Sequence, residues 1–173
     1  MFQKLKEQKA FLAKEKGFTL IELLIVIAII AIIAAVVFVA LDPLTRFQDS
    51  RDSSRWTDAS AILNAIKVDQ VDNGGAYLAA ITALTAGTSY MVGDGTSGCD
   101  ASPCDVTVGA NNCVDLTDLV TEGYLGSVPI SPNGGGTWSA STTGYTLTSD
   151  ATGIITVQAC ESENVTGDIK VSR

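Results

Sequence analysis

The chain has 173 residues, a formal net charge of −8 and no histidine, and 46% of its residues are hydrophobic. This length suits one domain with an appendage rather than two full domains. The lack of histidine excludes histidine-based nucleophilic triads and removes the commonest general base and catalytic metal ligand. The acidic balance disfavours contact with nucleic acid phosphates, so we expect no direct nucleic-acid binding.

Residues 1–17 form a basic segment, which we interpret as a cleaved leader. They hold five lysines and two glutamates, whereas the acidic excess lies in the rest of the chain. Positive charge before an apolar span predicts that the N-terminus stays in the cytoplasm. An ordinary secretory signal fits less well, because the apolar run that follows is too long and no pair of small residues closes it. An uncleaved membrane anchor is a further alternative.

Residues 18–41 are apolar except for Glu22. A helix over this stretch would be about 36 Å long, enough to cross the hydrocarbon core of a bilayer. The sequence therefore predicts a transmembrane helix here. Asp42 and Pro43 interrupt the pattern, because proline removes a backbone donor.

Residues 42–173 are predicted to form an extracytoplasmic head that includes the second half of a helix reaching from about Phe18 to Asp72. Apolar residues recur there at helical spacing up to the stop signal Asn73-Gly74-Gly75, which predicts an amphipathic face. The face consists of Ala59, Ile62, Leu63 and Ile66. We interpret the charged residues of this helix, including the pair Asp52 and Arg55, as a solvated surface.

The sequence of the remainder of the head predicts a small antiparallel sheet. Residues 144–148 and 153–159 are rich in β-branched and aromatic residues and predict a hairpin. Residues 115–125 predict a short helix, whereas residues 76–112 predict little regular structure. The predicted fold class is therefore α+β, with a long N-terminal helix packed on a C-terminal antiparallel sheet.

All four cysteines lie in the predicted head. They are Cys99, Cys104, Cys113 and Cys160. Their spacing fits no standard zinc finger, and an extracytoplasmic compartment favours disulfides. We expect two disulfides, with three connectivities open. The nearby acids Asp94, Asp100 and Asp105 lack the spacing of an EF-hand, so solvated surface is preferred to a calcium site. We expect no metal and no cofactor.

The most specific motif is the string KGFTLIE at residues 16–22. Together with the basic leader, it resembles the precursors of the type IV pilin and pseudopilin family, closely over residues 14–41. The resemblance implies that a prepilin peptidase cleaves between Gly17 and Phe18 and methylates the new amine of Phe18.

The same resemblance assigns Phe18, Thr19 and Glu22 to subunit assembly. The amine of Phe18 would pair with Glu22 of a neighbouring subunit, since an unpaired charge in an apolar core is costly. The alternative is that Glu22 only caps the start of its own helix. The implied partners are copies of the chain and other pilins in a filament, the prepilin peptidase, an inner-membrane assembly platform and, before assembly, membrane lipid.

We interpret the chain as a structural pilin, not an enzyme. It would be a single-pass inner-membrane protein with its N-terminus inside, and later part of an extracellular pilus. The alternative is a pseudopilin of a type II secretion system, in a periplasmic pseudopilus; the acidic, Ser/Thr-rich head with its cysteines favours the pilus. A membrane-tethered binding or hydrolase domain is a third hypothesis, but the sequence has no nucleophile motif such as G-x-S-x-G.

Overall fold

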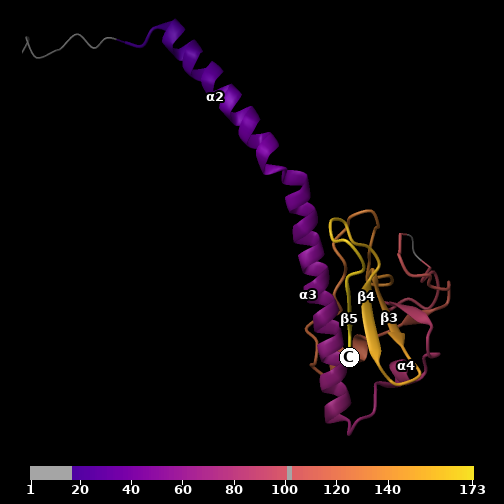
Figure 1. The fold of residues 1–173 in the computed structure, drawn as a ribbon. Helices are drawn as coiled ribbons and strands as arrows, with labels where there is room; N and C mark the ends of the chain where they lie inside the picture. The colour runs from indigo at the N-terminus through magenta and orange to yellow at the C-terminus, as the bar shows by residue number, and fades with distance from the viewer. Residues whose placement is uncertain (1–16, 101–102) are drawn as a thin grey trace, which may run out of the picture. The chain divides into compact units, whose positions relative to one another are not determined.

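The computed structural model describes residues 17–100 and 103–173 (Figure 1). Residues 1–16 of the predicted leader lie outside this range. The chain divides into two compact units, Met1–Pro43 and Leu44–Arg173. The second unit begins two residues after residue 42, the predicted start of the head.

In the first unit the apolar segment forms helix α2, Leu20–Leu41. The helix begins at Leu20 rather than Phe18, because Thr19 has extended backbone angles and acts as the N-cap. At the other end Asp42 has a φ of 38°, in the left-handed region, and Pro43 follows as the first residue of the next helix. The predicted interruption is therefore present, and it separates two helices.

Helix α3, Pro43–Asp72, is the predicted amphipathic helix of the head. All four residues of the predicted apolar face are buried. They share one hydrophobic cluster with sheet residues that include Tyr145, Leu147 and Val157. Figure 1 shows α3 running alongside strands β3, β4 and β5. The helix ends at the predicted stop signal, where Gly74 and Gly75 have φ values of 66° and 97° that favour glycine.

The sheet has five strands in the order β2-β1-β3-β4-β5. The predicted hairpin is confirmed, because β3 and β4 pair antiparallel from Tyr145 opposite Ala159 to Ser149 opposite Ile155. Among the described strands, β1 and β2 make the one parallel pair; the others are antiparallel. The strands are β1 (Ser89–Val92), β2 (Cys113–Val114), β3 (Tyr145–Ser149), β4 (Ile155–Ala159) and β5 (Lys170–Ser172).

The prediction of little regular structure in residues 76–112 is wrong in part, because helix α4 (Ala79–Thr82) and strand β1 lie there. Strand β5 was also not predicted. The predicted short helix is present as α5, Thr117–Thr121. Both disulfides are formed, with Cys99 joined to Cys113 and Cys104 joined to Cys160, one of the three connectivities that the sequence left open. A second hydrophobic cluster, which includes Trp138, surrounds them.

Candidate processing and assembly segment

The start of α2 is a capping box made by Thr19 and Glu22. The Thr19 hydroxyl accepts a hydrogen bond from the Glu22 backbone N–H at 3.2 Å, and the Thr19 N–H donates to Glu22 Oε2 at 2.7 Å. The two donors would otherwise be orphaned at the helix start. The motif therefore places a helix start two residues after Phe18, whose side chain is 92% exposed.

Glu22 uses one of its two carboxylate oxygens in this cap. Oε2 accepts from both the N–H and the hydroxyl of Thr19, each at 2.7 Å. Within residues 17–100 and 103–173, no hydrogen bond or ion pair reaches Oε1. The capping role that we weighed as an alternative is thus present in the isolated chain, and it leaves the second oxygen available for a positively charged partner.

The surface of α2 is apolar along its whole length. Its 22 residues are all exposed, and Glu22 is the one charged residue among them. At about 1.5 Å per residue the helix is about 33 Å long, which matches a hydrocarbon core of about 30 Å. The described residues contain one helical stretch, Leu20–Asp72, that is long and apolar enough to cross a membrane, and its apolar part is α2.

Comparison with known protein families identifies this segment. Residues 12–38 match the family described as the prokaryotic N-terminal methylation motif. The chain carries the type IV pilin and pseudopilin signature. Comparisons with curated proteins and with solved structures found no match.

The pilin signature accounts for the exposed apolar helix. It supports a type IV pilin or pseudopilin in general, and therefore a membrane-anchored precursor that assembles into filaments. Proteins with this motif are structural subunits rather than enzymes. A helix of this composition is compatible with two environments, lipid before assembly and the apolar surfaces of other subunits afterwards.

The head contains a largely buried set of charged residues. We define the ion cluster as Arg51, Asp52, Arg55, Glu161 and Glu163. The interpretation of Asp52 and Arg55 as solvated surface is wrong, because their side chains are 2% and 0% exposed. Their partners on the C-terminal segment lie more than 100 residues along the chain, beyond the reach of any local pattern.

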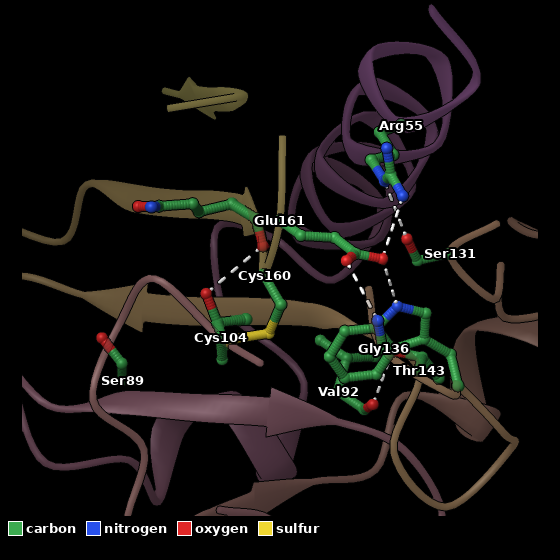
Figure 2. Close-up of a disulfide and its surroundings, with 12 residues drawn as sticks. Arg55, Ser89, Val92, Cys104, Ser131, Gly136, Thr143, Cys160 and Glu161 are labelled. Carbon is green, nitrogen blue, oxygen red and sulfur yellow. Dashed lines mark hydrogen bonds and ion pairs between the residues drawn. A yellow bond between two sulfur atoms is a disulfide. The ribbon is translucent and has the colours of Figure 1, made fainter. Parts of the chain in front are cut away.

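Arg55 satisfies all five of its N–H donors inside the head. Figure 2 shows its guanidinium directed at Ser131 and Glu161, with the Cys104–Cys160 disulfide beside Glu161. The acceptors and distances are Asp52 Oδ1 (2.7 Å), Glu163 Oε1 (2.8 Å), Glu161 Oε1 (2.9 Å), the Pro132 carbonyl (2.9 Å) and Ser131 Oγ (3.1 Å). A lysine has three donors and no planar fork, so it would leave part of this set unpaired.

The two glutamates of the ion cluster bind further groups. Glu161 Oε1 accepts from the Trp138 indole at 2.9 Å, and Oε2 accepts from the backbone N–H groups of Gly135 and Gly136. Glu163 also forms an ion pair with Arg51. The glycine-rich loop approaches closely, since a Cβ at Gly136 would come within 2.6 Å of the Trp138 ring. This close approach explains a glycine at position 136.

Asp52 holds the C-terminal segment against α3. Its carboxylate accepts from the backbone N–H groups of Glu163, Asn164 and Val165 at 2.8 to 3.2 Å. Burial alone would raise the pKa of Asp52, but these donors and Arg55 hold that pKa below its ordinary value. The ion cluster therefore binds residues 161–165 to the same helix that carries the core.

The remaining predicted positions lie apart from the motif. Asp94, Asp100 and Asp105 are exposed, in agreement with the interpretation as surface. Among the described residues there is no group of three or more acidic, cysteine or histidine side chains arranged for a metal ion. The predicted cleavage bond Gly17–Phe18 lies before the helix, and a Cβ at Gly17 would meet no described atom within 4 Å. Steric crowding within the described residues therefore does not explain why a glycine stands at position 17.

Proposed function

We propose that this chain is the structural subunit of a type IV pilus-like filament. A prepilin peptidase cleaves it after Gly17 and methylates Phe18, and the mature subunit polymerises through residues 18–41. Residues 42–173 form the extracytoplasmic head. The observation that carries this proposal is the match to the methylation motif over residues 12–38, which includes most of an apolar helix whose every residue is exposed. Such a helix needs partners that the chain does not supply itself.

The proposal assigns two roles to Glu22. Oε2 caps α2 through Thr19, and Oε1 accepts from the amine of Phe18 in a neighbouring subunit. Because cleavage creates that amine, processing and charge pairing are coupled: an uncleaved chain has no cation at this position to neutralise the acid. The inner-membrane assembly platform would receive subunits that are still held in lipid by α2.

The head favours the pilus over the pseudopilus of a type II secretion system. Its two disulfides and its buried ion cluster hold a loop-rich head together by means other than a large core. A surface filament is exposed to the medium for long periods, and such cross-links suit that exposure.

The experiment is mass spectrometry of protein recovered from sheared surface filaments, compared with the membrane fraction. Abundant mature protein with methylated Phe18 in the filaments is the expected result. A variant with Gly17→Leu should stay as an uncut precursor in the membrane and serves as the processing control. Mature protein found in the membrane fraction alone would replace the pilus with the pseudopilus. An intact N-terminus in the unaltered chain would overturn the filament proposal.

A further inference from the structure

A cavity of about 340 Å³ opens on the surface of the head, and nothing in the filament role uses it. Its wall is mostly apolar and includes Leu116, Val120, Val128 and Ala140. The volume lies at the small end of the range for ligand pockets, about 300–1,000 Å³. It therefore suits a group of side-chain size rather than a large cofactor.

Asp94 and Asp115 are among the residues that line the same cavity, and the parallel strands explain why both lie at this edge of the sheet. Val92 of β1 lies opposite Val114 of β2, and the Gly93 N–H extends the pair by donating to the Val114 carbonyl at 3.0 Å. Asp94 lies two residues after the end of β1, and Asp115 is the residue after the end of β2. Residues that leave the carboxyl ends of parallel strands emerge at the same edge of a sheet, a common position for ligand sites.

The cavity has negative charge with no positive charge to balance it. No residue that lines it is basic. Asp115 Oδ1 accepts from the Thr117 N–H at 2.9 Å, and across residues 17–100 and 103–173 no lysine or arginine pairs with Asp94 or Asp115. An apolar wall beside two carboxylates complements an organic cation. It fits a bare divalent ion poorly, because such an ion needs six or more oxygen ligands.

We propose that this cavity binds a lysine or arginine side chain presented by a protein partner. The alkyl stem lies on the apolar wall, and the cationic head group lies at Asp94 and Asp115. The partner's main chain stays outside, where the hydroxyl-bearing residues Thr117 and Thr121 also line the opening. The site is independent of the proposed function, because binding by the full chain is measurable whether or not filaments form.

A disulfide and a tightly packed glycine constrain the backbone beside the two acids. The Cys99–Cys113 disulfide closes the connection between β1 and β2, with Asp94 five residues before it and Asp115 two residues after it. Gly93 is packed so closely that an added Cβ would lie 2.3 Å from the Ser141 carbonyl oxygen. A preorganised site of this kind loses little entropy when a ligand binds.

The test is calorimetric titration of the full chain in detergent micelles with N-acetyl-lysine methylamide. The matched probes are the norleucine derivative, which keeps the stem without the charge, and n-butylammonium, which keeps stem and charge without the peptide groups. We expect saturable binding of the lysine probe that weakens with salt. Asp94→Asn/Asp115→Asn should weaken it about five- to tenfold. Asp105→Asn/Asp118→Asn removes the same charge outside the cavity and should leave binding unchanged.

A second variant tests the apolar wall. Ala140→Leu keeps both carboxylates but fills the cavity, so it should also weaken binding of the lysine probe. Equal binding of the norleucine and lysine probes, or an unchanged affinity in Asp94→Asn/Asp115→Asn, would overturn the cation site. Tighter binding of n-butylammonium than of the lysine probe would overturn the assignment to a protein side chain.

Discussion

Helices α2 and α3 are neighbours in the sequence, but only α3 buries part of its surface against the rest of the chain. Every residue of α2 is exposed, whereas α3 buries eight of its 30 residues, including both apolar and charged ones. The two helices also differ in how far a charged side chain finds hydrogen-bond partners within the chain. Glu22 satisfies one oxygen within its own chain, while Arg55 satisfies all five donors.

This difference separates the two tasks of the subunit. The surface of α2 stays unsatisfied until a membrane or another subunit covers it, so changes there should affect assembly. The buried face of α3 packs within the head, so changes to that face should affect folding. A single substitution that impaired both filament assembly and the folding of the head would contradict this distinction.

The largest effect on assembly is expected for Glu22→Ala. It should leave membrane insertion and the thermal unfolding midpoint of the head unchanged, since Glu22 lies in the other unit. Filament incorporation should fall at least about tenfold, because an unpaired amine would be buried in the filament core. The measurement is the yield of sheared filaments from cells carrying the variant alone.

Glu22→Gln is the matched control for this prediction. A glutamine at this position can still accept from the Thr19 N–H, so the capping box is kept while the charge is lost. Filaments should be lost in this variant too. Normal filaments with Gln, but not with Ala, would mean that capping is the whole role of Glu22.

In the head, the largest effect is expected for Arg55→Ala. The change leaves Asp52, Glu161 and Glu163 close together without their shared cation, and breaking a buried pair costs about 3–5 kcal/mol. Urea unfolding of the full chain in detergent measures this free energy. Arg46→Ala removes an exposed charge from the same helix and should change the stability by less than about 0.5 kcal/mol. Similar losses in both variants would contradict the importance of the ion cluster.

The two disulfides should differ in their contribution to the stability of the head. The bridge Cys104–Cys160 spans 56 residues of sequence and Cys99–Cys113 spans 14. Chain entropy then predicts a loss of about 4 kcal/mol for Cys104→Ala/Cys160→Ala and about 3 kcal/mol for Cys99→Ala/Cys113→Ala. Unfolding midpoints of the two double variants give the ranking, and a reversed order would rule out this entropic account.

Sequence patterns predicted the elements that follow a local period and missed those that depend on long-range contacts. The apolar face of α3 and the β3–β4 hairpin were predicted, because each follows a local period of the chain. The N-terminal methylation motif was also recognised from the sequence, since a lone acid in an apolar run is costly and therefore rare. Strands β2 and β5 have two and three residues, too few to show alternation, and they exist through long-range pairing.

The ion cluster could not be inferred for a different reason. Asp52 and Arg55 stand three residues apart on a helix, which is also the pattern of an exposed pair. Their burial depends on Glu161 and Glu163, which return to α3 from the far end of the chain. The one local signal was the glutamate directly after Cys160, a disulfide-forming residue that holds the segment near the core.

The smallest effect expected is a loss of head stability in acid. Arg51 holds the pKa of Glu163 below its ordinary value of 4.5, and hydrogen bonds outweigh burial to hold that of Asp52 below 3.8. A lowered pKa in the folded state means that the stabilisation is complete above these ordinary values. It is then lost as the pH falls through them toward the folded-state values. The thermal midpoint should therefore be nearly constant from pH 7 to about pH 5 and fall by several degrees below that.

Asp52→Asn separates this contribution from that of the other carboxylates. The variant should have a lower midpoint than the unaltered chain at pH 7 and a smaller fall in acid, because one of the two lowered pKa values is gone. Circular dichroism of both proteins in the same detergent, from pH 7 to about pH 2, gives the two profiles. If the profiles run parallel, Asp52 does not link protonation to folding, and the acid sensitivity arises from other carboxylates such as Glu163.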